Sequence, residues 1–139
     1  PLLNFNLIKK VVCYSNDLFQ SKKIHYSTTI NGSLLTEDIM NFFAKNKVSV
    51  GISLDGPSEI QNKHRKFYET GGETFNIVFN KVSQLSKIDK KYFDEHITFQ
   101  PVRMVDENID DIENFYEKMG VSKKRVLISK ANYEKKSAY

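Results

Sequence analysis

Cysteine is nearly absent from this chain of 139 residues, and histidine is scarce. The single cysteine, Cys13, excludes any disulfide within the chain. Its neighbours Val11 and Val12 lie in a stretch with helical spacing, so we expect Cys13 to pack in the apolar interior rather than to act as a reactive thiol. The three histidines, at positions 25, 64 and 96, are too scattered to form a local metal-binding motif.

Long hydrophobic runs are missing as well. No stretch is apolar and long enough to cross a bilayer, and no secretory segment is visible, so we expect a soluble, cytoplasmic protein without a membrane partner. A length of 139 residues with 40 % hydrophobic content predicts one domain with its own core.

Acidic residues are fewer than basic ones, which gives a formal net charge of +4 and invites a nucleic-acid interpretation. The lysines nevertheless alternate with acids except at residues 123–136, where we expect a solvated tail. No groove motif interleaves aromatic with basic residues, which argues against nucleic acid as a partner. Gly-x-Gly-x-x-Gly and a phosphate-loop lysine are also absent, which argues against a small nucleotide-binding domain.

What the chain does contain is an alternation of helical and strand patterns. Apolar periodicity predicts helices over residues 1–19, 36–47, 74–85 and 106–120, and β-forming runs predict strands at residues 23–29, 49–54, 96–104 and 125–129. The expected N-caps are Thr36, Thr74 and either Asp106 or Asn108. Pro101 predicts an edge, a bulge or an early stop in its strand, and residues 57–72 read as a long loop or a short irregular helix. This order predicts an α/β fold of about four parallel strands, either a doubly wound sheet or a slice of a barrel.

The most informative stretch is SVGISLDGP at residues 49–57. Its apolar residues alternate with small polar ones, as in a strand that carries polar groups to its C-terminal end, where parallel α/β folds bind ligands. Asp55, Gly56 and Pro57 then end the strand abruptly. For an isolated Asp-Gly-Pro sequence, a solvated turn without function is the alternative explanation.

Four motifs in order favour a specific family: PLLNF at residues 1–5, TINGSLL at 29–35, SVGISLDGP at 49–57, and Arg65. Together they resemble the radical S-adenosylmethionine enzymes, in the branch of anaerobic sulfatase maturases and SPASM peptide maturases. The resemblance implies a fragment of a partial (β/α)6 TIM barrel. Ile30 departs from the usual threonine before Asn-Gly, and Gln61-Asn62 stands where His-Asp is common in the family.

The resemblance implies that the complete enzyme uses S-adenosylmethionine and a [4Fe–4S] cluster, and abstracts hydrogen from a peptide or protein substrate. In that setting Ser53 binds the ribose or methionine moiety and Arg65 grips the methionine carboxylate, while Asn31 and Asp55 contact the cofactor or brace their turns. Leu127 and Ile128 are candidates to lie beside the adenine, although an ordinary core strand explains them better. No catalytic residue and no metal ligand is assigned.

The family's Cys-x-x-x-Cys-x-x-Cys motif has no counterpart in these residues. We therefore expect residues 1–139 to be an incomplete radical S-adenosylmethionine core that lacks the cluster-binding N-terminal part and any C-terminal SPASM extension, and to be inactive alone. Unpaired strand edges predict a homo-oligomer of this fragment. A non-catalytic α/β binding or assembly module stays open as the alternative, because fold does not fix function.

Overall fold

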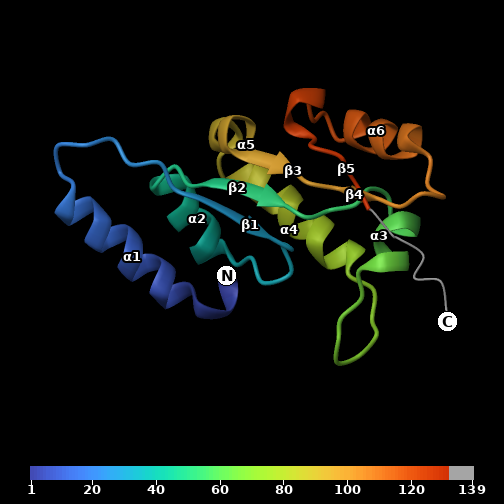
Figure 1. Cartoon of the computed structure of the whole chain (residues 1–139). Helices are drawn as coiled ribbons and strands as arrows, with labels where there is room; N and C mark the ends of the chain where they lie inside the picture. The colour runs from blue at the N-terminus through green and yellow to red at the C-terminus, as the bar shows by residue number, and fades with distance from the viewer. Residues whose placement is uncertain (132–139) are drawn as a thin grey trace, which may run out of the picture.

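The computed structural model describes residues 1–131, so part of the expected basic tail lies outside the described residues. Helices and strands alternate through most of this part of the chain (Figure 1). Within it, none of the helices combines the length and the apolar character needed to cross a membrane.

The strands are parallel. β1 (Ser27–Ile30), β2 (Ser49–Ile52) and β3 (Ile97–Phe99) form a sheet in the order β1-β2-β3. The short strands β4 (Val102–Arg103) and β5 (Ser129–Lys130) form a second parallel pair. The predicted α/β fold with parallel strands is therefore confirmed.

Pro101 interrupts the strand expected at residues 96–104. Proline has no amide hydrogen for a strand ladder, and the segment divides into β3 before it and β4 after it. The chain that leads into β5 nevertheless bonds to both parts, since the Leu127 amide donates to the Phe99 carbonyl at 2.8 Å and the Ser129 amide to the Pro101 carbonyl at 2.9 Å. The predicted early stop is confirmed. The last strand begins later than expected, because a 3-10 turn, η2 (Lys123–Arg125), precedes it.

Helices cover one face of the sheet and leave the other open. They are η1 (Leu2–Asn4), α1 (Phe5–Leu18), α2 (Glu37–Lys45), α3 (Ser58–His64), α4 (Phe75–Ile88), α5 (Lys90–His96) and α6 (Ile109–Lys118) (Figure 1). The strand residues Val50, Ile52 and Phe99 are buried in one core with apolar residues of α2, α4, α5 and α6. The open face carries a depression of about 380 Å³ whose lining includes Thr29, Gly51 and Gln100.

The helix starts follow the predicted caps with one exception. Thr36 accepts a hydrogen bond from the Ile39 amide at 3.4 Å, and Asn108, rather than Asp106, caps α6. Thr74 makes no such bond, because its hydroxyl is engaged elsewhere. The first amide of α4 instead donates to Asn62 Oδ1, at 3.0 Å.

One prediction for α1 was wrong, and one helix was missed. Cys13 is exposed rather than buried, because α1 turns Val12 into the protein and carries the next residue round to solvent. The helix α5 was not predicted, since its seven residues give too short a pattern. Its start is capped by Asp89, which accepts from the Tyr92 amide at 2.8 Å.

Candidate functional site

Two of the predicted site residues lie at one edge of the parallel sheet. Asn31 follows β1 and Ser53 follows β2, and the strands are in register there because Ile30 is paired with Ile52. The Ser53 amide donates to the Ile30 carbonyl at 2.8 Å, which fixes the level of both strand ends. Carboxyl ends of parallel strands carry the ligand sites of α/β barrels. This edge is therefore the candidate site, and a binding role for either residue stays a prediction.

Asn31 opens a tight turn that leads away from β1. Its Oδ1 accepts hydrogen bonds from the Ser33 amide at 3.2 Å and from the Ser33 hydroxyl at 3.0 Å. Gly32 follows at φ +80°, and a Cβ there would lie 2.9 Å from Cγ1 of Val78, so no larger residue fits without a shift. Asn31 thus braces its turn, which is one of the two roles expected for it.

Asp55 is buried, with a residue exposure of only 2 %. Its Oδ2 accepts a hydrogen bond from Arg65 Nε at 2.6 Å, and its Oδ1 accepts from Arg65 Nη2 at 3.0 Å and from the Val102 amide at 2.9 Å. A buried carboxylate needs such partners, since an unpaired charge is costly away from water. Asp55 therefore ties the end of β2 to the loop after α3 and to β4, and the sequence analysis had not paired it with Arg65.

Arg65 uses only one side of its guanidinium group for this ion pair. A guanidinium carries five N–H donors in a fixed plane, and the fork of Nε and Nη2 accounts for two of them. The side chain is 30 % exposed, in contrast to 3 % for Asp55, and it lines a cavity of about 330 Å³. Within residues 1–131, the other three N–H donors of the guanidinium group have no hydrogen-bond partner.

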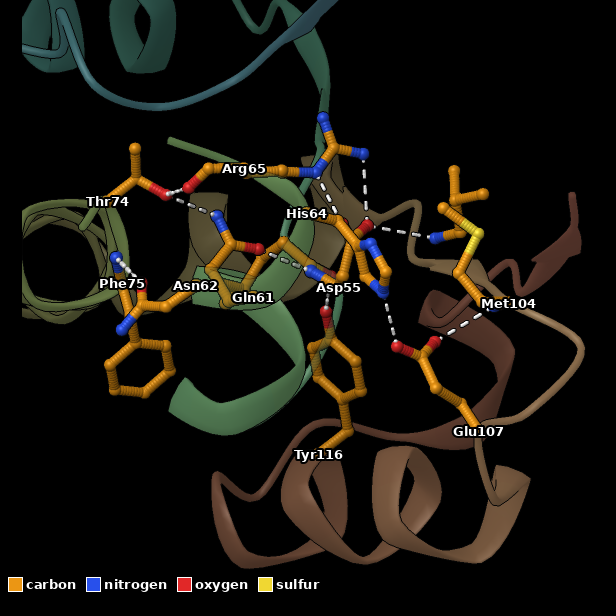
Figure 2. A network of polar contacts seen from close by, with 12 residues as sticks. Asp55, Gln61, Asn62, His64, Arg65, Thr74, Phe75, Met104, Glu107 and Tyr116 are labelled. Atoms are coloured by element: carbon orange, nitrogen blue, oxygen red, sulfur yellow. Dashed lines mark hydrogen bonds and ion pairs between the residues drawn. The ribbon is translucent and has the colours of Figure 1, made fainter. Parts of the chain in front are cut away.

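A closed ring of hydrogen bonds holds the backbone around this pair (Figure 2). The Asp55 amide donates to Oε1 of Gln61 at 2.8 Å, and Nε2 of Gln61 donates to the Thr74 hydroxyl at 3.0 Å. That hydroxyl donates to the Arg65 carbonyl at 2.6 Å, and Arg65 closes the ring on Asp55. Gln61 and Thr74 are both buried, so every member of the ring is fixed by its neighbours.

A second pair of contacts joins α3 to the loop before α6. His64 Nε2 lies 2.7 Å from Glu107 Oε1, and Oε2 of the same buried carboxylate accepts from the Met104 amide at 2.9 Å (Figure 2). On the surface beside it, the hydrogen bond from Lys63 lowers the pKa of Asp106. Sequence reasoning missed Glu107, because its partner His64 lies on a distant segment of the chain.

Tyr116 of α6 supports the same region from below the sheet edge. Its hydroxyl donates to the Leu54 carbonyl, one residue before Asp55. Burial raises the pKa of this hydroxyl well above its ordinary value of 10.0, and the charge of Asp55 acts in the same direction. The neutral tyrosine is thus the form that the fold stabilises.

Two adjoining cavities open at the sheet edge. One has a volume of about 330 Å³ and the other about 620 Å³, and both are lined by Asn31, Ser33, Phe67 and Tyr68. We call them together the cleft. The loop of residues 31–35 contributes Asn31, Ser33 and Leu34 to the lining, and the loop of residues 65–73 contributes residues 65–70. We call these two loops the walls of the cleft. A bridge between Lys66 and Glu73 joins the two ends of the second loop. Ser53 is half-buried and lines neither cavity.

A metal or cluster has no ready ligand set here. Among residues 1–131, no three histidine, cysteine, aspartate or glutamate side chains gather in a way that could hold a metal ion. Leu127 and Ile128 directly precede β5. Ile128 packs against the core, as the core-strand explanation predicts, whereas Leu127 is exposed, so that explanation does not hold for Leu127.

Comparison with known proteins identifies the relatives of this chain. The cysteine-type anaerobic sulfatase-maturating enzyme of Clostridium novyi is 35 % identical over 96 residues, which cover 68 % of this chain and 24 % of that protein. The solved structure of native anSMEcpe with bound AdoMet and Kp18Cys peptide matches with a TM-score of 0.80 at 26 % identity, over 97 % of this chain and 37 % of that one. The chain is homologous to a segment of the radical S-adenosylmethionine sulfatase maturases. The family resemblance predicted from the motifs is confirmed.

Other relatives agree with this assignment to the sulfatase maturases. The Clostridium perfringens enzyme of the cysteine type is 39 % identical over 74 residues, and the serine-type enzyme of Bacteroides thetaiotaomicron is 32 % identical over 87 residues. These two matches cover 19 % and 21 % of the respective enzymes, so the chain spans about a fifth of each. No protein-family model matches the chain.

Proposed function

We propose that this sulfatase-maturase segment forms part of the S-adenosylmethionine site of a radical enzyme that modifies a peptide or protein side chain. The observation that carries the proposal is the orientation of Arg65. Buried Asp55 holds the guanidinium group through Nε and Nη2, and the partly exposed Arg65 side chain lines the cleft at the carboxyl end of the strands. A planar, oriented cation of this kind is suited to bind a ligand carboxylate.

The other predicted residues take supporting roles in this proposal. The Ser53 hydroxyl binds the ribose or the methionine moiety, and Asn31 lines the cleft opposite Arg65. Asp55 acts through Arg65 and does not touch the ligand, since its oxygens are occupied by protein donors. The larger cavity adds apolar surface from Leu2, Ile30 and Phe67, against which a purine ring can pack.

The [4Fe–4S] cluster does not fit these residues. Three thiolates are the usual ligands, and the sequence has only Cys13, which is exposed on α1. In the proposed complete enzyme, such a cluster would supply the redox chemistry. The part assigned to these 139 residues is limited to binding and orienting the cofactor.

A peptide or protein as substrate is proposed on the strength of the relatives, of which anSMEcpe is described with a bound peptide. The cytoplasmic location and the homo-oligomer both stay predictions. The alternative of a non-catalytic binding or assembly module predicts no affinity for S-adenosylmethionine.

A titration followed by nuclear magnetic resonance tests the proposal on the chain itself. S-adenosylmethionine should shift the backbone amides of Asn31, Ser53 and Lys66 in a saturable way, and should leave those of α1 unchanged. The matched probe is 5′-methylthioadenosine, which lacks the carboxylate and should bind more weakly. Failure of S-adenosylmethionine to give saturable shifts at these positions would contradict the proposal and favour the assembly module.

A further inference from the structure

One face of α4 contacts both walls of the cleft. Thr74, at the start of the helix, donates to the Arg65 carbonyl at 2.6 Å. Val78, one turn later, lines the cleft and closely approaches Gly32. Lys81 follows at a further three residues, on the same face of the helix. The helix therefore forms a common support for the loop that carries Asn31 and for the loop that carries Arg65.

Lys81 makes the most specific of these contacts. Its Nζ donates to the Ser33 carbonyl at 2.8 Å and to the Leu35 carbonyl at 2.7 Å. These two carbonyls belong to residues 31–35, the first wall of the cleft. Within residues 1–131, none of the ion pairs involves Lys81, so its part-buried ammonium group depends on backbone carbonyls. Hydrogen bonds from a charged donor are stronger than neutral ones, and losing them leaves two acceptors unpaired.

We propose that Lys81 is a positioning residue for the cleft. It fixes the loop of residues 31–35 relative to Arg65, and so sets the separation at which Asn31 and Arg65 can contact one ligand. The effect on ligand affinity rests on the proposed function, whereas the effect on the geometry of the loop does not.

The test compares Lys81→Met with Lys81→Arg. Methionine keeps the length and the apolar stem but removes the charge and the donors, while arginine keeps both. Lys81→Met should weaken S-adenosylmethionine binding by roughly fivefold. Effects of this size are typical of residues that influence a binding site without contacting the ligand. Lys81→Arg should restore most of the affinity. The control is Ser83→Ala on the same helix. It removes a hydrogen bond to the Phe79 carbonyl, and Ser83 lines neither cavity of the cleft.

A second measurement needs no ligand. Amide hydrogen exchange should become faster at Ser33 and Leu35 in Lys81→Met, while exchange in the middle of α4 should change little. The proposal is overturned if Lys81→Met lowers the melting temperature but leaves unchanged both the affinity for S-adenosylmethionine and the amide exchange at Ser33 and Leu35. If the wild-type chain itself fails to bind S-adenosylmethionine, the proposed function fails, and the exchange rates still decide whether Lys81 positions the loop.

Discussion

Arg65 donates two parallel hydrogen bonds to the buried carboxylate of Asp55, from Nε at 2.6 Å and from Nη2 at 3.0 Å. Ten residues of chain separate the two, and α3 lies between them. The ion pair therefore fixes the orientation of the Arg65 guanidinium group. That orientation is the property on which the proposed cofactor site depends.

Asp55→Asn should destabilise the protein and release Arg65. The substitution keeps the shape but removes the charge, so Arg65 loses a charged acceptor. Hydrogen bonds to charged groups contribute about 1.5–3 kcal/mol each, and partial exposure of Arg65 places the expected loss at the lower end, about 2 kcal/mol. Urea unfolding measures it. The matched control is Asp106→Asn, which breaks an exposed pair with Lys63 and should cost clearly less. Equal losses for the two variants would show that the Asp55 pair has no special role.

Stability should fall in alkaline solution because of Tyr116. Its pKa is raised in the folded protein, so the folded state keeps the hydroxyl proton after the unfolded state has begun to lose it. The contribution is fully present below the ordinary pKa of 10.0 and declines as the pH rises above it. Burial raises the pKa of Tyr92 too, with the same sign. Unfolding free energies measured between pH 9 and 11 should fall less steeply in Tyr116→Phe, and an unchanged slope would contradict the assignment.

The isolated chain should not cleave S-adenosylmethionine. One cysteine cannot supply the thiolates of a cluster, whatever the affinity for the cofactor. Anaerobic reconstitution with iron and sulfide, followed by an assay for 5′-deoxyadenosine, should give no product above that of Cys13→Ser. Formation of 5′-deoxyadenosine that depends on Cys13 would disprove this expectation.

The homo-oligomer predicted from the sequence now has a defined surface to test. The exposed apolar residues of α1 recur on one face of the helix and include Leu7, Val11, Tyr14 and Leu18. β1 lies at the edge of the sheet beside β2. We expect sedimentation velocity to show association of the wild-type chain that Leu7→Lys and Tyr14→Lys weaken. A wild-type chain that remains monomeric at high concentration would refute the prediction.

Much of the fold was predictable because its signals are local. Periodicity located most of the helices and strands, the cap at Thr36 was correct, and Pro101 marked the break between β3 and β4. Four motifs also indicated the family. The prediction for Cys13 failed because a one-residue step around α1 decides between the core and solvent.

The arrangement of the candidate site was not predictable in the same way. Asp55 meets Val102, and His64 meets Glu107, across more than forty residues of chain. Lys81 binds backbone carbonyls, which have no signature in the sequence. Thr74 was predicted only as a helix cap, and Gln61 was noted only as a departure from the family pattern. Neither signal indicates the ring of hydrogen bonds that these two residues form with Asp55 and Arg65.

The most direct test of the proposed site removes the contact between Arg65 and the ligand carboxylate in two ways. One removes the Arg65 side chain from the protein, and the other removes the carboxylate from the ligand. Affinities for S-adenosylmethionine and for decarboxylated S-adenosylmethionine are measured by calorimetry on the wild type and on Arg65→Ala, with Lys87→Ala as a charge-matched control on an exposed part of α4. Arg65→Ala should cost about 2 kcal/mol for S-adenosylmethionine and little for the decarboxylated ligand, because a charged pair with the carboxylate is lost only in the first case. Ser53→Ala should weaken both ligands modestly, by about 1 kcal/mol. Equal losses for both ligands in Arg65→Ala would contradict the assignment of Arg65 to the carboxylate.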